Sequence, residues 1–372
     1  MAKFFTLLLI VVCTNVVVAP DALAQQRAPT REPFEDAVDR GLEWLSKNQS
    51  QDGSWMTGRA FGNINQGRGI REPAVTALAV MAFLSAGHVP GEGKYAEVID
   101  KGIRYVTSSQ HRNGLFAAQP TSQTIMYSHG ICTLMLAEVI GMINSREVAD
   151  RYREQLVAAI KLIRAAQCTN GLDSGGWRYR LQSLDSDISV TGWQVMALRA
   201  ARNVGCDIPT DTIDGAVEYI KRCHDPLSGG YRYMRSAQVT VPCTGTSVLA
   251  LELCGKEFHL SLEARRAGSY ILRTENRLTQ NRPHFFYGIY YTSQAMFQLG
   301  GGYWASYRKV LHQLLLSDFS PAEGGYWTSD SWDDRIYGVN YCTAMAVLAL
   351  TVEYRFLPIY QRNEEPETPD ED

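Results

Sequence analysis

Two carboxylates stand directly ahead of an apolar segment in "DSDISVTGWQVMAL", residues 185–198. A carboxyl group in apolar surroundings holds its proton to higher pH and can serve as a general acid. Asp just before a helix is also a preferred N-cap, because its side chain accepts a main-chain N–H of the first turn. Both roles are open for Asp187, which is the best candidate for a catalytic carboxylate.

A second acidic cluster lies at residues 329–335, "SDSWDDR". Asp333 and Asp334 could work with Asp187 as the acid and base of a glycoside hydrolase, which needs two carboxyl groups about 5–10 Å apart. The same two residues could instead cap a helix, so a structural role is equally open for them.

Aromatic and basic residues near the starts of the apolar segments form the candidate ligand-binding set. The motifs "GGWRY" (175–179) and "GGYRY" (229–233) each supply an Arg that could face an anion or pair with a neighbouring carboxylate. Aromatic residues at helical spacing are usually core, and a lone His is usually structural. We predict a cavity lined by Tyr127, His129, Arg178, Trp193, Arg232, Tyr291 and Tyr341.

The elements that position these residues are repeated along the chain. Residues 40–55, "RGLEWLSKNQSQDGSW", and residues 101–116, "KGIRYVTSSQHRNGLF", share a pattern of Gly, aromatic, Gln, Gly and aromatic residues. Looser copies end at Trp177 and Tyr231, and a weaker one precedes residues 324–327. The repeat residues that we expect to be structural are Gln49, Gly53, Trp55, Gln110, Gly114 and Phe116.

Each copy is followed by a segment that is apolar on nearly every side, as in a helix buried on all faces. Six pairs of one amphipathic and one buried helix predict an all-α (α/α)6 toroid of six helix hairpins. We favour a closed ring over an open array because no terminal pair shows a polar outer face. The toroid is expected to be a single domain over residues 25–358.

The first two copies resemble the Q-W repeat of squalene-hopene and oxidosqualene cyclases. The resemblance implies the terpene cyclase/protein prenyltransferase superfamily, whose prenyltransferase and squalene oxidase repeats build such a toroid. Aligning Thr191 with the Thr of the cyclase motif D-x-D-D-T-A places Asp187 on the first Asp and Ser189 on the proton donor. Ser cannot protonate an alkene, so the resemblance implies a toroid without the standard cyclase acid.

The prenyltransferase branch of the same superfamily binds zinc through Asp-x-Cys and a His. Here Asn340-Tyr341-Cys342 carries Asn in place of that Asp. Catalytic zinc needs three protein ligands, and no such set can be assembled from these residues. We therefore expect neither a metal ion nor another cofactor.

The two ends of the chain predict its destination. The first residues, "MAKFFTLLLIVVCTNVVVAPDALAQQ", read as a signal peptide over 1–24, with export to the periplasm or medium and no stable membrane span. Residues 359–372 include "EEPETPDED" and read as an acidic disordered tail. The net charge of −3 without a basic stripe argues against a nucleic-acid partner.

Three functions stay open. The first is binding or transformation of an extended apolar, isoprenoid-like ligand in an aromatic-lined cavity. The second is a non-catalytic toroid that binds a protein or lipid. The third is a carbohydrate-active (α/α)6 enzyme that uses paired Asp residues at the mouth. Whether the protein is an enzyme at all is left open by the sequence.

Overall fold

The computed structural model describes residues 31–58, 70–279, 282–318, 321, 323–328 and 332–361, without the side chains of 318 and 332–335. The predicted signal peptide and nearly all of the acidic tail lie outside this part of the chain. Two units, Met1–Glu32 and Pro33–Asp372, divide the chain, and the twelve α-helices of the described residues all belong to the second.

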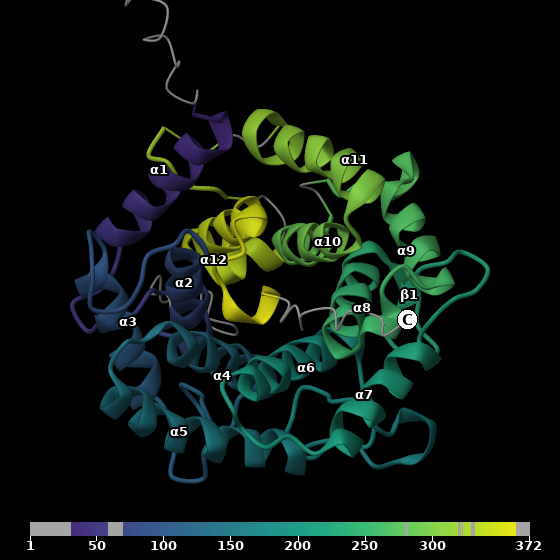
Figure 1. The fold of residues 1–372 in the computed structure, drawn as a ribbon, viewed down its shortest axis with the longest axis horizontal. Coiled ribbons are helices and arrows are strands. Elements are labelled where there is room, and N and C mark those ends of the chain that lie inside the picture. The colour runs from purple at the N-terminus through teal and green to yellow at the C-terminus, as the bar shows by residue number, and fades with distance from the viewer. Residues whose placement is uncertain are drawn as a thin grey trace, which may run out of the picture. The chain divides into compact units, whose positions relative to one another are not determined.

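Six helices form the inside of this second unit, as Figure 1 shows. Each contacts the next along the chain, and the last contacts the first, so the set closes on itself. A run of apolar residues without a polar face explains their position; α2, for example, buries every one of its residues. The inner helices are α2 (Pro73–Ser85), α4 (Ile125–Met142), α6 (Ile188–Asn203), α8 (Val241–Cys254), α10 (Phe285–Leu299) and α12 (Trp332–Leu350).

The other six helices surround the inner set (Figure 1). They are amphipathic: α3 buries Ile99, Ile103 and Val106 at helical spacing and turns charged residues to solvent. The predicted (α/α)6 toroid is therefore confirmed. The outer helices are α1 (Pro33–Lys47), α3 (Ala96–Ser108), α5 (Arg146–Ala165), α7 (Thr210–Arg222), α9 (Leu262–Leu272) and α11 (Gly301–His312).

Short elements complete the unit. The strands β1 (Tyr231–Arg232) and β2 (Val239–Thr240) pair antiparallel ahead of α8. A π-helical segment, Gln313–Asp318, extends α11, and Gly338 kinks α12 near its start with a φ of 83°. Among the described residues, five 3-10 helices cover Gly171–Asp173, Lys256–Phe258, Thr274–Asn276, Thr351–Tyr354 and Pro358–Tyr360.

The repeated Gln residues tie neighbouring outer helices together. Gln49 Nε2 donates to the carbonyl of Gly53 at 3.0 Å and to that of Val98, in α3, at 2.8 Å. Gln110 makes the same pair of bonds to Gly114 and to Gln155 of α5, at 3.1 and 2.8 Å. The side chain thus satisfies carbonyl groups of a turn and of the next helix at once.

The aromatic residue of each repeat is a buried anchor. The indole N–H of Trp55 donates to the Leu45 carbonyl at 2.8 Å, and that of Trp177 to Ile163 at 2.7 Å. The loosest copy keeps this bond, from Trp327 to Leu315 at 3.0 Å. The side chain of Phe116 has no indole N–H and is fully buried, so its ring is held by packing.

Two inner helices are long and apolar enough to cross a bilayer, by length and composition alone: Ile125–Met142 and Ile336–Tyr354. Most of each is covered by the rest of the protein. Both belong to the inner ring, where apolar residues on every side are expected of a core helix.

Candidate functional site

A cavity of about 920 Å³ opens at the N-terminal ends of the six inner helices. All six contribute to its wall, together with the loops that precede them. Its volume falls at the upper end of the range of about 300–1,000 Å³ that small-molecule sites occupy. The centre of the ring is therefore hollow at this end rather than filled by side chains.

The wall of the cavity is mostly apolar and aromatic. Tyr127, Trp193 and Tyr341 line it, where the sequence placed them. Tyr179 and Tyr233, the last residues of the two Gly-Gly motifs, join them. Further apolar residues of the wall are Ile70, Ala74, Val75, Leu78, Ile131, Val239, Val241, Pro242, Leu278, Tyr287 and Ile336.

Tyr291 lies behind this wall, which corrects the expectation that it lines the cavity. It is fully buried, with its ring centroid 5.2 Å from that of Trp193 and 4.7 Å from that of Tyr287. Tyr287 and Trp193 occupy the surface in its place. Helical spacing alone could not separate these two layers, because α10 is apolar on every side.

His129 also differs from the expected position, because both of its ring nitrogens bond to the backbone. Nδ1 accepts the main-chain N–H of Phe116 at 3.2 Å, and Nε2 lies 3.1 Å from the Ala159 carbonyl. The side chain is fully buried and forms no part of the cavity wall. Burial lowers the pKa of His129 to about 4, so the ring is neutral at pH 7.

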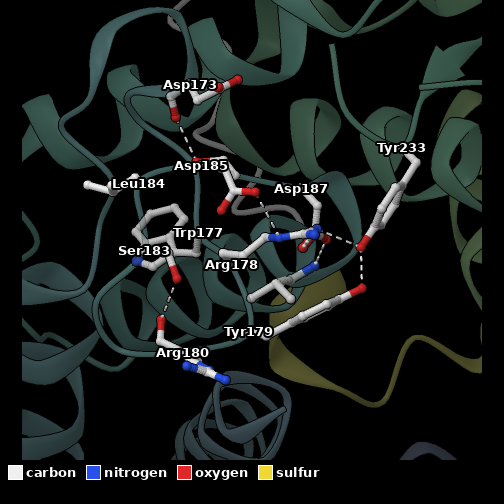
Figure 2. Close-up of polar contacts among 12 residues, drawn as sticks. Asp173, Trp177, Arg178, Tyr179, Arg180, Ser183, Leu184, Asp185, Asp187 and Tyr233 are labelled. Carbon is white, nitrogen blue, oxygen red and sulfur yellow. Dashed lines mark hydrogen bonds and ion pairs between the residues drawn. The ribbon is translucent and has the colours of Figure 1, made fainter. Parts of the chain in front are cut away.

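Asp187 is the N-cap of α6 and is fully buried (Figure 2). Its Oδ1 accepts the Val190 N–H at 2.9 Å and the Ser189 hydroxyl at 2.6 Å. Its Oδ2 accepts Nη1 of Arg178 at 3.0 Å. Burial raises the pKa of Asp187, against these three donors, which favour the charged form.

The Asp187 carboxylate does not line the cavity and is connected to it through the hydroxyl group of Ser189. Ser189, on the position of the cyclase proton donor, lines the cavity and lies 2.5 Å from the Tyr127 hydroxyl. Both carboxylate oxygens of Asp187 accept hydrogen bonds, and the side chain lies behind the cavity wall. Asp187 therefore supports residues of the wall and does not itself face the cavity.

The two arginines of the Gly-Gly motifs form salt bridges with carboxylates and do not line the cavity. Arg178 bridges Asp187 and Asp185, with the Asp185 contact at 3.3 Å, and donates to the Tyr233 hydroxyl at 2.7 Å (Figure 2). Arg232 pairs with Asp225 at 2.6 Å. Of the two roles open from the sequence, the salt bridge to a neighbouring carboxylate is the one observed. Neither guanidinium belongs to the wall, which corrects the expected ligand-binding role.

Asp333 and Asp334 begin α12, but their side chains fall outside the described part of the chain. The hypothesis that they pair with Asp187 therefore stays untested, and only the side chain of Asp187, whose oxygens are occupied, can be described. Within the described residues, no group of three or more His, Cys, Asp or Glu side chains could hold a metal ion.

Glu72 is a residue of the cavity wall that the predicted site set did not include. It occupies the N-cap position of α2, where a carboxylate is ordinarily structural, yet its side chain makes no capping bond. It lines the cavity and accepts a hydrogen bond from the Ser128 hydroxyl of α4. Among the described lining residues it is the sole carboxyl, and burial raises its pKa.

The opposite ends of α4 and α6 are covered by residues near the C-terminus. The 3-10 helix Pro358–Tyr360 packs on both helices. Glu138 of α4, fully buried there, accepts the Ile359 N–H at 3.2 Å, and Tyr360 lies 2.8 Å from Tyr290, hydroxyl to hydroxyl. Burial raises the pKa of Glu138 to about 8.

Comparison with known proteins bears on the fold and on the resemblance to the cyclase superfamily. Residues 12–129 match the family model of the squalene-hopene cyclase C-terminal domain. The type II terpene cyclase MstE from Scytonema superposes with a TM-score of 0.57 at 14% identity, over 87% of this chain and 99% of that chain. The resemblance to the terpene cyclase-like superfamily is confirmed.

Other toroids superpose on this chain at least as well as the terpene cyclase. The α-1,6-mannanase GH76A from Salegentibacter sp. HEL1_6 superposes with a TM-score of 0.65 at 12% identity, over 87% of this chain and 99% of that chain. At such identities the likeness shows the fold alone. Among curated protein sequences, none matches this chain.

Proposed function

We propose that this protein binds, and where chemistry follows transforms, an extended apolar molecule of the isoprenoid kind in the cavity of the ring. The observation that carries the proposal is the cavity wall: about 920 Å³ lined by Trp193, several tyrosines and aliphatic side chains. Removing apolar ligand surface from water contributes about 25 cal/mol per Å², so such a wall favours an apolar occupant. The squalene-hopene cyclase-like sequence of the first third supports the same class of ligand.

The likeness to mannanases keeps a carbohydrate ligand as the second candidate. A glycoside hydrolase needs two carboxyl groups facing its substrate. The described wall offers Glu72 alone, and Asp187 is buried behind the wall with both oxygens bonded. The described geometry therefore supports an apolar ligand better than a sugar.

Mass spectrometry of an organic-solvent extract of the protein, purified from a native-like host, tests the proposal. A stoichiometric isoprenoid or hopanoid in the extract is the expected result. Ala74→Phe places a ring in the wall and should reduce retention of that compound, whereas Ala165→Phe places the same ring on the exposed outer surface and should not. Equal retention by the two variants would place the ligand elsewhere.

We also propose export, on the sequence of residues 1–24 alone, and a lipid or protein as the natural partner rather than a nucleic acid. N-terminal sequencing of the protein recovered from the periplasm or medium tests the cleavage. A mature chain that begins near residue 25 is expected, and an intact N-terminus in the cytoplasm would contradict the proposal.

A further inference from the structure

The carboxyl group of Glu72 is not needed to hold α2 in place. Glu72 has an extended backbone, with φ −86° and ψ 121°, and no side-chain cap bond. Pro73 follows at the first helical position, where its missing N–H leaves one fewer donor to satisfy. The side chain is therefore available for another role than helix capping.

The contacts of Glu72 differ from those of Asp187. Asp187 binds Arg178 and two further donors, whereas Glu72 accepts the Ser128 hydroxyl and has no ion-pair partner in the described part of the chain. The neighbouring Arg71 is directed elsewhere, to Asp52 at 3.0 Å. A carboxyl group without a cation and largely removed from water favours its neutral form.

Several of the side chains near Glu72 in the cavity are apolar. Ala74, Val75 and Leu78 of α2 line the same wall, and Ile131 lies one helical turn beyond Ser128 on α4. Binding sites of this kind fix the orientation of an apolar ligand through a few placed polar groups. A neutral carboxyl can both donate and accept a hydrogen bond, so it matches a hydroxyl group, which does the same.

We propose that Glu72, oriented by Ser128, is the polar anchor of the cavity and selects an apolar ligand that carries a hydroxyl group. The inference rests on the proposed function and narrows it, from any extended apolar molecule to an alcohol of that class. Glu72 is here a specificity-determining residue. The hydroxyl occupies the end of the cavity between α2 and α4, and the hydrocarbon part extends along the aromatic wall.

Binding measurements with a pair of probes separate the contribution of Glu72 to ligand affinity from that of the apolar cavity wall. The probes are farnesol and the hydrocarbon of the same carbon skeleton without the hydroxyl group, titrated into the full mature protein. The wild-type protein should bind farnesol more tightly by on the order of tenfold, the equivalent of one good hydrogen bond. Glu72→Leu should abolish this ratio while the hydrocarbon affinity is kept.

Three further variants give the comparison its controls. Glu72→Gln keeps a donor and an acceptor and should retain part of the preference, and Ser128→Ala, which frees the carboxyl to rotate, should reduce it. Glu154→Gln makes the same change on the exposed face of α5 and should leave the ratio unchanged. Because Glu72 makes no capping bond, its variants should keep a melting temperature close to that of the wild type.

The possible results distinguish the two proposals. If neither probe binds, both the proposed function and the anchor are overturned. If both probes bind with equal affinity to the wild-type protein, the cavity function stands and the role of Glu72 is overturned. The same conclusion follows if Glu72→Leu keeps the preference for farnesol.

Discussion

His129 and Thr76 hold equivalent positions in successive repeats. Nδ1 of His129 accepts the main-chain N–H of Phe116 at 3.2 Å, and Oγ1 of Thr76 accepts that of Trp55 at 3.0 Å. Thr191, Thr244 and Thr343 accept the equivalent N–H groups of the later copies, at 3.0, 2.9 and 3.1 Å. The histidine is therefore one version of a repeated structural bond.

Replacing His129 should remove an acid sensitivity. Its pKa is lowered to about 4 in the folded protein against about 6.5 unfolded, so the unfolded chain binds the extra proton between these values. The stability that the neutral ring supplies is fully present above pH 6.5. About 3 kcal/mol of it is lost as the pH falls to 4.

Urea unfolding of wild type and His129→Thr between pH 4 and 7 checks this prediction. The free energy of unfolding of the variant should fall less steeply with acidification. His111→Gln removes a partly exposed histidine and should behave as wild type. Parallel curves for wild type and His129→Thr would show that the buried ring does not carry the effect.

Asp187 should cost more to remove than a simple N-cap, for which about 0.5–2 kcal/mol is expected. Its loss leaves Arg178 partly buried beside a vacant site, and breaking a buried pair costs about 3–5 kcal/mol. We expect Asp187→Ala near that range, Asp187→Asn below it because the amide still caps, and Asp185→Ala under about 1 kcal/mol because Asp185 is exposed. Urea titration of the three variants gives their free energies of unfolding and so their order. Equal losses of stability for Asp187→Ala and Asp185→Ala would contradict the expected order.

Glu138 should make the protein less stable as the pH rises. Its pKa is raised to about 8, against about 4.3 in the unfolded chain, so the folded state holds the proton between these values. Stability is fully present below pH 4.3 and declines by roughly 1.4 kcal/mol per pH unit up to 8. The neighbouring hydroxyls of Tyr290 and Tyr360 stay neutral over this range, because burial raises both pKa values.

Glu138→Gln should flatten that decline, since the amide has the same shape and does not titrate. Melting temperatures of wild type and variant from pH 5 to 8 measure it, with the exposed Glu154→Gln as the control. A variant that loses stability with pH as steeply as wild type would assign the effect to another group.

Gly53→Ala should destabilise the protein by more than Gly93→Ala. Both glycines have positive φ, 88° and 82°, so both substitutions carry a strain of about 1–2 kcal/mol. At Gly53 a Cβ would lie 2.3 Å from the main-chain oxygen of Lys101, whereas at Gly93 nothing lies within 4 Å. The clash should add about 1–3 kcal/mol, read as the difference between the two free energies of unfolding. Equal costs would show that the Lys101 backbone moves aside freely.

The sequence predicted the fold well because the repeat carries its own geometry. Gln49 and Gln110 recur with fixed spacing to Gly and an aromatic residue, and one local pattern therefore specifies one helix junction. The completely apolar segments form helices that are buried on every face, and this requirement identifies the helices of the inner ring.

The site could be predicted only in part, because the tertiary fold, and not the spacing along the sequence, decides which side chains face the cavity. Tyr127 and Tyr291 are both tyrosines of inner helices, in α4 and α10, yet the first lines the cavity and the second packs behind it. Glu72 reads as an ordinary N-cap, and only the position of Ser128, 56 residues away, shows what it contacts. The signal that could have found it is a carboxyl that precedes Pro at the start of a wholly apolar helix.

The closure of the ring also determines when the protein can fold. α1 packs on α12, Asn340 donates to the Met56 carbonyl at 2.7 Å, and Thr351 donates to Ser85 at 2.8 Å across 266 residues. An open solenoid can fold from any repeat, because each needs only its neighbours. Here the first repeat lacks its partner until the last has left the ribosome. Contacts of such long sequence separation slow folding. The apolar face of α1 therefore stays exposed during synthesis, and a chaperone bound there would reduce aggregation.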